Sequence, residues 1–438
     1  MPAADLVLAL DEGTTSARSI VFDRGGAVVA VAQREFEQRY PAPGDVRHDP
    51  EAIWAAQLVT AREAIASAGG AERIAAIGVT NQRETAVVWD RATGRAVADA
   101  IVWQSRVTAP FCEALRAAGH EPAIRERTGL PVDAYFSGPK IRQVLVEDPS
   151  LRGRAERGEL AAGTVESFLI ARLTGGSVHV TDVSNASRTL LLDIRSGAWD
   201  EELLTLMDVP RPLLPEVRST SEVYGLTDPT LFGRSIPIAG AAGDQQAATF
   251  GQACFEVGEA KVTLGTGAFL LANTGASVVS SGRGLLATIA WKLGPDAPIV
   301  YAIEGSVFIT GAAEIARATL ESIAFQVRDV IEAMDAELDR PLTELRIDGG
   351  GASDLVCGLV ADQVDRPVER PVVRETTAFG AAALAGLAVG LWRDPAEIAA
   401  IRRVDRRFVP SESAAARDAA YRAWRRGVDR ARGWAAGE

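Results

Sequence analysis

Lysine, cysteine, histidine and methionine are scarce in this 438-residue chain, which has three of each. The cysteines, Cys112, Cys254 and Cys357, are odd in number and show no CxxC or Cys/His spacing, so we expect neither a disulfide framework nor a structural zinc site. A reducing cytoplasm is the expected location. Arginine supplies nearly all of the positive charge, and no Gly-Lys pair occurs, which excludes a Walker A phosphate loop. If the protein binds a nucleotide, its phosphates must therefore be held by a structural motif other than a Walker A loop.

Basic patches and long apolar runs are also missing. The formal net charge of −12 argues against a nucleic-acid surface. The N-terminal segment MPAADLVLALDEG lacks the basic region and the long apolar run of a secretory signal. The longest uncharged apolar stretch, residues 378–392, is too short and too rich in glycine for a membrane span, so a buried helix is predicted there.

What is present is the composition of a folded protein, with 47% hydrophobic and 24% charged residues. Short apolar strands and amphipathic helices alternate in the first hundred residues and again from residue 236 onward, which predicts an α/β fold. The clearest helix begins after Asp49 and ends at Gly69-Gly70. Because two such patterns meet near residue 250, we expect an N-terminal domain at 1–250 and a C-terminal domain at 251–438.

Two Gly-Thr turns lie between short apolar strands, about one domain apart: DEGTT at 11–15 and LGTG at 264–267. Each turn by itself fits an ordinary hairpin. Together with a third glycine-rich strand end at 348–351 they favour nucleotide binding, because backbone N–H groups and hydroxyls in such turns can hold a polyphosphate without lysine.

Two carboxylates end predicted strands beside these turns. Asp11 could hold Mg²⁺ near phosphates, or alternatively close its loop as an Asx turn. Asp244, in the segment AGDQQ, could accept the proton of an attacking hydroxyl group, or alternatively cap the helix that follows. The spacing alone leaves these alternatives open.

Arg83 and Glu84 are adjacent between two predicted strands. On a surface they would form a pair of little energetic worth, whereas in a cleft they would offer donors and an acceptor to the hydroxyl groups of a small polyol. The histidines, His48, His120 and His179, show no metal-ligand spacing and are interpreted as structural.

Eight segments carry a resemblance to a known family: DEGTTSARSIVFD, GVTNQRET, IVWQSR, YFSGPK, TDVSNASRT, PIAGAAGDQQAATFGQ, LGTGAF and IDGGGAS. In this order they resemble the FGGY family of carbohydrate kinases, and within it the members that act on glycerol, over nearly the whole chain. The resemblance implies an α/β fold with two ribonuclease H-like domains of the actin and hexokinase type flanking a cleft. It also implies ATP and Mg²⁺ as cofactors, glycerol as the small-molecule substrate, and a homodimer or homotetramer.

Residue roles follow from the same resemblance. It implies that seven residues bind glycerol: Arg83, Glu84, Trp103, Tyr135, Asp244, Gln245 and Phe269. Asp244 would be the catalytic base, and Asp11 would position Mg²⁺ through water. A second set would bind the nucleotide: Thr14, Thr15, Ser16, Arg18, Thr266, Gly311, Gly350 and Asp354.

The chain departs from the family pattern after Gly311, where roughly sixty residues that the family has are absent. The second domain is therefore shortened, and a missing strand is expected to leave a gap in its sheet with unpaired backbone groups. Two smaller departures accompany this one. Glu12 stands where the family has glutamine, which adds negative charge near the phosphates, and Asp354 stands where asparagine is common.

The sequence therefore predicts an enzyme that phosphorylates glycerol to sn-glycerol 3-phosphate with ATP, the first step of glycerol catabolism. Two alternatives stay open. One is a glycerol-binding pseudoenzyme inactivated by the internal gap, and the other is a kinase of the same family that acts on another sugar or polyol.

Overall fold

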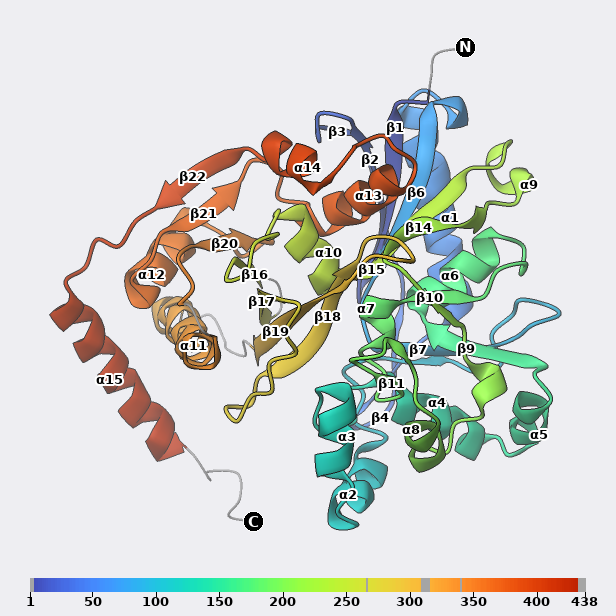
Figure 1. The fold of residues 1–438 in the computed structure, drawn as a ribbon, viewed down its shortest axis with the longest axis horizontal. Coiled ribbons are helices and arrows are strands. Elements are labelled where there is room, and N and C mark those ends of the chain that lie inside the picture. The colour runs from blue at the N-terminus through green and yellow to red at the C-terminus, as the bar shows by residue number, and fades with distance from the viewer. Residues whose placement is uncertain (1–3, 265–266, 309–315, 339–340, 432–438) are drawn as a thin grey trace.

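Two large mixed β-sheets, one in each half of the chain, organise the fold (Figure 1). A computed structural model describes residues 4–264, 267–308, 316–338 and 341–431. The strands of the first sheet lie in the order β14 (Ser221–Leu226), β15 (Pro237–Gly243), β6 (Ile74–Asn81), β1 (Leu6–Glu12), β2 (Ser16–Asp23) and β3 (Val28–Glu35). Those of the second lie in the order β18 (Leu286–Lys292), β19 (Ile299–Phe308), β17 (Gly267–Gly275), β16 (Ala260–Leu264), β20 (Leu345–Asp348), β21 (Val368–Pro371) and β22 (Val404–Phe408).

The two sheets share the arrangement of five central strands. Three neighbouring strands pair antiparallel in each, β1–β2–β3 in the first sheet and β16–β17–β19 in the second, where β18 adds an outer strand beside β19. Two more strands then add in parallel, β6 and β15 beside β1 in the first sheet and β20 and β21 beside β16 in the second. The repeated order puts the carboxyl ends of β1 and β16, at which the two Gly-Thr segments begin, at equivalent places in the two halves.

Smaller sheets and most short helices belong to the first half. A five-stranded sheet has the order β4 (Gln38–Ala42), β5 (Asp45–His48), β8 (Ala100–Ile101), β7 (Ala86–Asp90) and β9 (Leu160–Thr164). Two strand pairs are β10 (Val180–Asp182) with β13 (Glu216–Arg218), and β11 (Leu192–Asp193) with β12 (Ala198–Trp199). The helices are α1 (Pro50–Ser67), α2 (Ala109–Ala117), α3 (Glu121–Thr128), α4 (Ser137–Glu147), α5 (Ser150–Glu156), α6 (Val165–Leu173), α7 (Val183–Ala186), α8 (Glu201–Leu206), α9 (Pro229–Phe232) and α10 (Asp244–Gly251).

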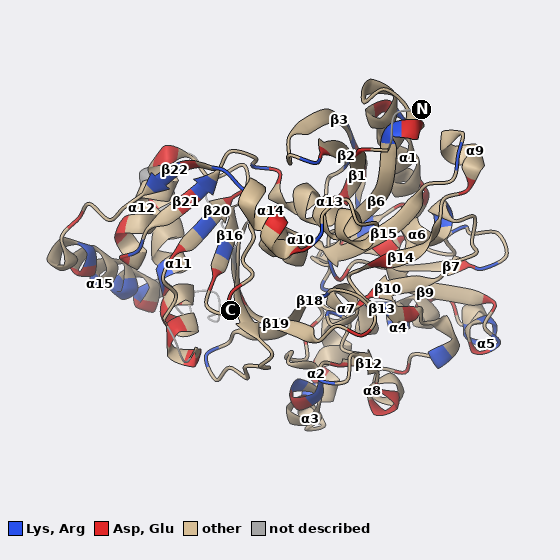
Figure 2. Ribbon diagram, turned by 45° about the horizontal axis from the view of Figure 1, so that its top comes forward, with Lys and Arg blue, Asp and Glu red and all other residues tan. Residues whose placement is uncertain are grey.

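The second half has five helices in its described residues: α11 (Ala316–Glu337), α12 (Asp354–Val364), α13 (Thr376–Ala388), α14 (Pro395–Ile401) and α15 (Ala414–Ala431). Helix α15 lies at the outer edge of the molecule (Figure 1). Its Trp424 stacks on Phe325 of α11, with ring centroids 5.5 Å apart. The arginine positions along α15 are marked in Figure 2, and Arg422, Arg425, Arg426 and Arg430 are exposed.

Helix α13 joins the two halves. It is almost entirely buried, and it packs against β1, β6 and β15 of the first sheet and against α10. A Cβ atom on Gly380 would lie 1.8 Å from the carbonyl oxygen of Ala247, so this approach of α13 to α10 requires glycine. The buried helix predicted within residues 378–392 is confirmed. Among the described residues, none of the helices has the length and apolar character needed to span a membrane.

Local predictions can be checked at two segments. The helix expected after Asp49 is confirmed, since α1 begins at Pro50 and the Asp49 carboxylate accepts the backbone N–H of Glu51 at 2.9 Å. The turn expected over residues 11–15 is wrong in extent. The ladder continues through the pairs Asp11↔Arg18 and Glu12↔Ala17, so only residues 13–15 remain as a turn.

The gap expected in the second sheet is not found among the described strands. Hydrogen bonding is continuous from β18 to β22, because β20 pairs directly with β16 over Ala260 to Thr263. The junction that follows Gly311 lies outside the described residues. The absence of residues that the family pattern has therefore leaves no break in strand pairing in the described part of this sheet.

Candidate active site

A cavity of about 140 Å³ lies between the two halves of the chain. It is lined by Thr14, Gln82, Arg83, Glu84, Trp103, Gln104, Tyr135, Asp244, Gln245, Gly267 and Phe269. All seven residues that the sequence predicts as glycerol ligands are in this set. The structure therefore brings together side chains that are up to 186 positions apart, from both halves.

Strand ends position the polar side chains. Arg83 and Glu84 follow the carboxyl end of β6, and Asp244 follows that of its parallel neighbour β15, so the three side chains meet at one edge of the sheet. Gly243 makes this possible, because a Cβ atom there would lie 2.7 Å from the side-chain carbons of Arg83. Glu84 has a left-handed backbone with φ of 63°, which costs about 1–2 kcal/mol for a non-glycine residue.

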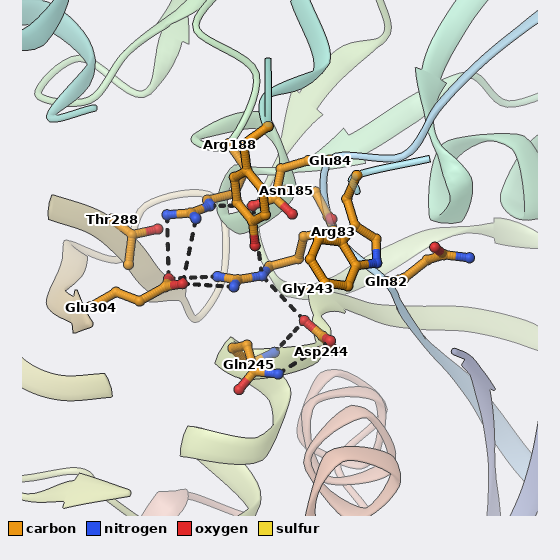
Figure 3. Close-up of polar contacts among 12 residues, drawn as sticks. Gln82, Arg83, Glu84, Asn185, Arg188, Gly243, Asp244, Gln245, Thr288 and Glu304 are labelled. Carbon is orange, nitrogen blue, oxygen red and sulfur yellow. Dashed lines mark hydrogen bonds and ion pairs between the residues drawn. The ribbon is translucent and has the colours of Figure 1, made fainter. Parts of the chain in front are cut away.

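Four fully buried charged residues form a network beneath the cavity (Figure 3). Arg83 donates to both carboxylate oxygens of Glu304, at 2.7 and 2.8 Å. Arg188 lies 2.6 Å from Glu84 and 3.3 Å from Glu304. Two arginines are thus balanced by two glutamates, so the network as a whole carries no net charge.

The network determines how Arg83 faces the cavity. Burial opposes ionisation of Glu304, but Arg188 and Arg83 outweigh it and lower the pKa of Glu304 to about 2. With both of its terminal nitrogens bonded to this carboxylate, Arg83 turns its Nε toward Asp244, 3.2 Å from Oδ1. Glu304 belongs to β19, so a residue of the second half orients a cavity residue of the first half.

Aromatic rings form the apolar walls. Trp103 lies edge-on to Tyr135, with ring centroids 5.7 Å apart, and to Phe269, at 6.4 Å. The indole N–H of Trp103 donates to Thr14 Oγ1 at 3.0 Å, which ties this wall to the first Gly-Thr turn. Such a site suits a small molecule with an apolar carbon chain and several hydroxyl groups.

Asp244 is the first residue of α10, and its side chain is 33% exposed. The alternative prediction, that Asp244 caps this helix, is wrong, because Gly243 occupies the N-cap position. The carboxylate instead accepts from the backbone N–H of Gln245 at 2.7 Å and from the Gln245 amide at 3.2 Å. Burial raises the pKa of Asp244, while Arg83 and Lys261 act against that rise. A carboxylate in these surroundings can serve as a general base.

The first Gly-Thr turn is short, and residues beside it form polar contacts with both halves of the chain. Gly13 donates its N–H to the Ser16 carbonyl at 3.0 Å. Arg18 bonds the Asp11 carboxylate at 2.5 Å and Glu375, just before α13, at 2.6 Å. Thr14 is the residue of this turn that reaches the cavity wall. The predicted phosphate-contacting residues Thr14, Thr15, Ser16 and Arg18 therefore lie in one stretch beside the polyol cavity.

Asp11 is the candidate residue for positioning Mg²⁺. It is buried, and burial raises its pKa while Arg18 opposes this. No cluster of three or more His, Cys, Asp or Glu suited to a metal occurs in the described part of the chain. Mg²⁺ commonly keeps several waters and binds through one or two carboxylates and substrate phosphates, so a single carboxylate beside a Gly-Thr turn fits this ion.

Glu12, at the end of β1, is completely buried and accepts from the Gln82 amide at 3.2 Å through both oxygens. Burial raises the pKa of Glu12 well above its usual range, and this favours the uncharged acid. The rise opposes the extra negative charge that the sequence leads us to expect near the phosphates.

The predicted nucleotide residues of the second half are only partly described. Gly350 follows β20 in the triple-glycine loop. This loop packs on the end of β16, since Gly349 has φ of 88° and a Cβ there would lie 2.3 Å from the Leu264 carbonyl oxygen. Asp354 begins α12 and pairs with Arg370 at 2.7 Å and Arg406 at 2.5 Å. Thr266 and Gly311 lie outside the described residues.

Three residues near the cavity escaped prediction: Arg188, Lys261 and Glu304. Arg188 lies in TDVSNASRT, a segment with no recognisable chemical spacing. Glu304 offered one signal, since it is the lone carboxylate in the apolar segment IVYAIEGSVF. Lys261 offered another, as one of only three lysines, placed within a short apolar strand.

Comparisons with known proteins give a consistent result. The model of the FGGY family of carbohydrate kinases, N-terminal domain, matches residues 6–251, and the C-terminal domain model matches residues 302–389. Glycerol kinase 2 of Thermotoga maritima is 48% identical, with 98% of this chain and 99% of the relative covered. Glycerol kinase of Deinococcus radiodurans is 47% identical, with 98% of each covered. Both alignments run over 492 positions, so the relatives carry positions that this 438-residue chain lacks.

Solved structures are similar over the same extent. A Plasmodium falciparum glycerol kinase with ADP superposes with a TM-score of 0.90 at 30% identity, covering 98% of both chains. A xylulose kinase from Rhodospirillum rubrum shares the fold, with a TM-score of 0.83 at 22% identity and coverage of 98% of this chain and 99% of the other.

Proposed function

Because this chain belongs to the FGGY family of carbohydrate kinases, we infer that it transfers the γ-phosphoryl group of ATP to a primary hydroxyl of glycerol. The product is sn-glycerol 3-phosphate. The observation that carries this inference is the single cavity in which Arg83, Glu84 and Asp244 meet an aromatic wall beside a Gly-Thr turn. Phosphoryl transfer of this kind depends mainly on positioning and on charge stabilisation.

We assign the chemical roles as follows. Arg83 and Glu84, with Tyr135 and Gln245, bond the hydroxyl groups of glycerol, while Trp103 and Phe269 contact its carbon chain. Asp244 accepts the proton of the attacking hydroxyl group. The first Gly-Thr turn contacts phosphates through Thr14, Thr15, Ser16 and Arg18, and the second half completes the nucleotide site through Thr266, Gly311, Gly350 and Asp354. When Mg²⁺ is bound near Asp11, it would neutralise negative charge on the phosphates.

The location and assembly are also proposals. All three cysteines are buried free thiols, which supports a reducing compartment and therefore the cytoplasm. For the assembly we propose a homodimer or homotetramer, and sedimentation of the purified protein would measure it.

The first test is ATP-dependent phosphorylation of glycerol by the purified chain. General base catalysis contributes about 10²–10⁴ in rate, so Asp244→Asn should lose at least that factor. Asp228→Asn is a matched control, because Asp228 caps α9 on the surface and asparagine is an equally good cap. Equal activity in the wild type and Asp244→Asn would contradict the assignment of the base.

A glycerol-binding pseudoenzyme is the second candidate, favoured by the positions that the relatives have and this chain lacks. Calorimetry separates it from the kinase. A pseudoenzyme would bind glycerol with no turnover and with an affinity that ATP does not change. A kinase of another sugar would instead turn over a pentulose at least as fast as glycerol.

A further inference from the structure

Two of the three lysines in this arginine-rich chain are buried at the cavity. Lys140 and Lys261 are fully inaccessible to solvent, whereas Lys292 at the end of β18 is partly exposed. Lys140 donates to the backbone carbonyls of Glu84 and Tyr135. Lys261 projects from β16 of the second half, and it is the one that contacts a cavity side chain directly. The assigned catalytic scheme gives it no role.

The Lys261 ammonium is placed by two acceptors. It donates to Oε1 of Gln245, on α10 of the first half, and to Thr263 Oγ1 at 2.9 Å. An ammonium group can only donate, so the Gln245 amide must present its oxygen to Lys261. The NH₂ group of the same amide then points the other way and donates to Asp244 Oδ2 at 3.2 Å. One buried charge thereby fixes which end of the amide faces the base.

Charged groups from several elements surround Lys261. Asp348 on β20, Asp244 on α10 and Glu304 on β19 favour its charged form, while Arg83, after β6, opposes it. Burial has the largest effect and lowers the pKa of Lys261 to about 8. In turn, the positive charge of Lys261 helps to keep Asp244 ionised against burial. Lysine suits this place because it is a compact point charge, whereas arginine presents a wide planar fork.

We propose that Lys261 is a positioning residue for phosphoryl transfer, which locks the Gln245 amide and holds Asp244 in its basic form from the opposite half of the molecule. This role rests on the proposed function. It follows that the cavity side chains of the first half reach their working arrangement only when β16 of the second half lies against α10.

The central variant is Lys261→Met, which keeps most of the length of the unbranched side chain and removes the charge. Loss of a charge-assisted hydrogen bond should lower kcat/KM for glycerol about 10- to 100-fold. The acid limb of the pH profile should move to higher pH, because Asp244 loses an opposite charge. In the wild type, activity should fall above about pH 8 as Lys261 is deprotonated, and in Lys261→Met this alkaline limb should disappear.

Two further variants complete the design. Lys292→Met is the matched control, because it makes the same change outside the cavity, and it should behave as the wild type. Lys261→Arg restores a charge that does not titrate, so it should move the alkaline limb to higher pH while retaining more activity than Lys261→Met. If thermal unfolding shows that Lys261→Met does not fold, the proposal is tested by the position of the alkaline limb in the pH profile of Lys261→Arg.

The outcomes are distinct. Folded Lys261→Met with kcat/KM within threefold of the wild type and an unchanged pH profile would overturn the proposal, as would an unmoved alkaline limb in Lys261→Arg. A wild type that shows no phosphorylation of glycerol contradicts the proposed function instead. In that case calorimetry with glycerol still tests Lys261, since Lys261→Met should weaken glycerol binding about 10-fold, and equal binding would overturn the role.

Discussion

Glu304 shows how one residue can connect the two halves of the molecule. Its carboxylate accepts hydrogen bonds from both terminal nitrogens of Arg83 and forms an ion pair with Arg188, and all three side chains are buried. The partners are separated by 221 positions in the chain, so no local pattern could reveal them. By contrast, the adjacency of Arg83 and Glu84 was visible in the sequence, where it fitted a surface pair as well as a cleft pair, and the structure places both residues at the cavity.

We predict that Glu304→Gln is strongly destabilising. Removing one partner of a buried ion pair leaves an uncompensated charge, and typically costs about 3–5 kcal/mol. Urea denaturation should report this loss, and KM for glycerol should rise because Arg83 is no longer held. Glu332→Gln makes the same change at an exposed pair with Arg328 and should cost less than about 1 kcal/mol. Similar losses in the two variants would contradict the role of the buried network.

At the scale of an element, α13 shows how composition determines packing. Its sequence TTAFGAAALAGLA offers little to distinguish its sides, so the sequence predicted burial but not the partner. The structure shows that the small side chains let α13 lie against α10 and the first sheet, although in the chain α13 lies between β21 and β22 of the second sheet. Which sheet a helix covers depends on contacts between distant segments, and these are not encoded in helical periodicity.

Glycine-to-alanine changes in two helices should have opposite effects. Gly380→Ala in α13 places a methyl group against the Ala247 carbonyl and should destabilise the fold by about 1–3 kcal/mol or more. Gly427→Ala in α15 meets no atom within 4 Å and should stabilise the fold by about 0.5–1 kcal/mol. Thermal unfolding of the two variants measures both effects, and a stabilised Gly380→Ala would contradict the packing described for α13.

At the scale of the whole molecule, most of the α/β organisation could be predicted from the sequence. Short apolar strands were expected before the second Gly-Thr turn and before the glycines of residues 348–351, and β16 and β20 occupy these places. The equivalence of the two Gly-Thr turns could be suspected from their similar surroundings. The strand order that the two large sheets share could not be predicted, because a pairing such as that of β16 with β20 joins segments more than eighty positions apart in the chain.

The stability of the whole molecule should depend on pH through two histidines, His48, which is buried, and His179, which is partly buried. Burial lowers the pKa of both His48 and His179 to about 4, from about 6.5 in an unfolded chain. The unfolded state therefore binds more protons between these values. Stability should be complete above about pH 6.5 and fall toward pH 4, by up to about 3 kcal/mol for each histidine.

Denaturation with urea at a series of pH values tests this dependence. His179→Gln keeps a donor for the Ala162 carbonyl, which His179 Nε2 contacts at 3.0 Å, and it should reduce the slope of stability against pH. A slope that is the same in the wild type and in His179→Gln would contradict the assignment.

The burial of Lys140 and Lys261 also has a practical consequence for chemical labelling. Among the lysines of the native protein, an acylating reagent should reach Lys292 alone, because the other two have no exposed surface. Acylation of Lys261 requires β16 to separate from α10. The rate at which Lys261 is acylated, followed by mass spectrometry, would therefore report how fast the cleft opens in the unmodified chain.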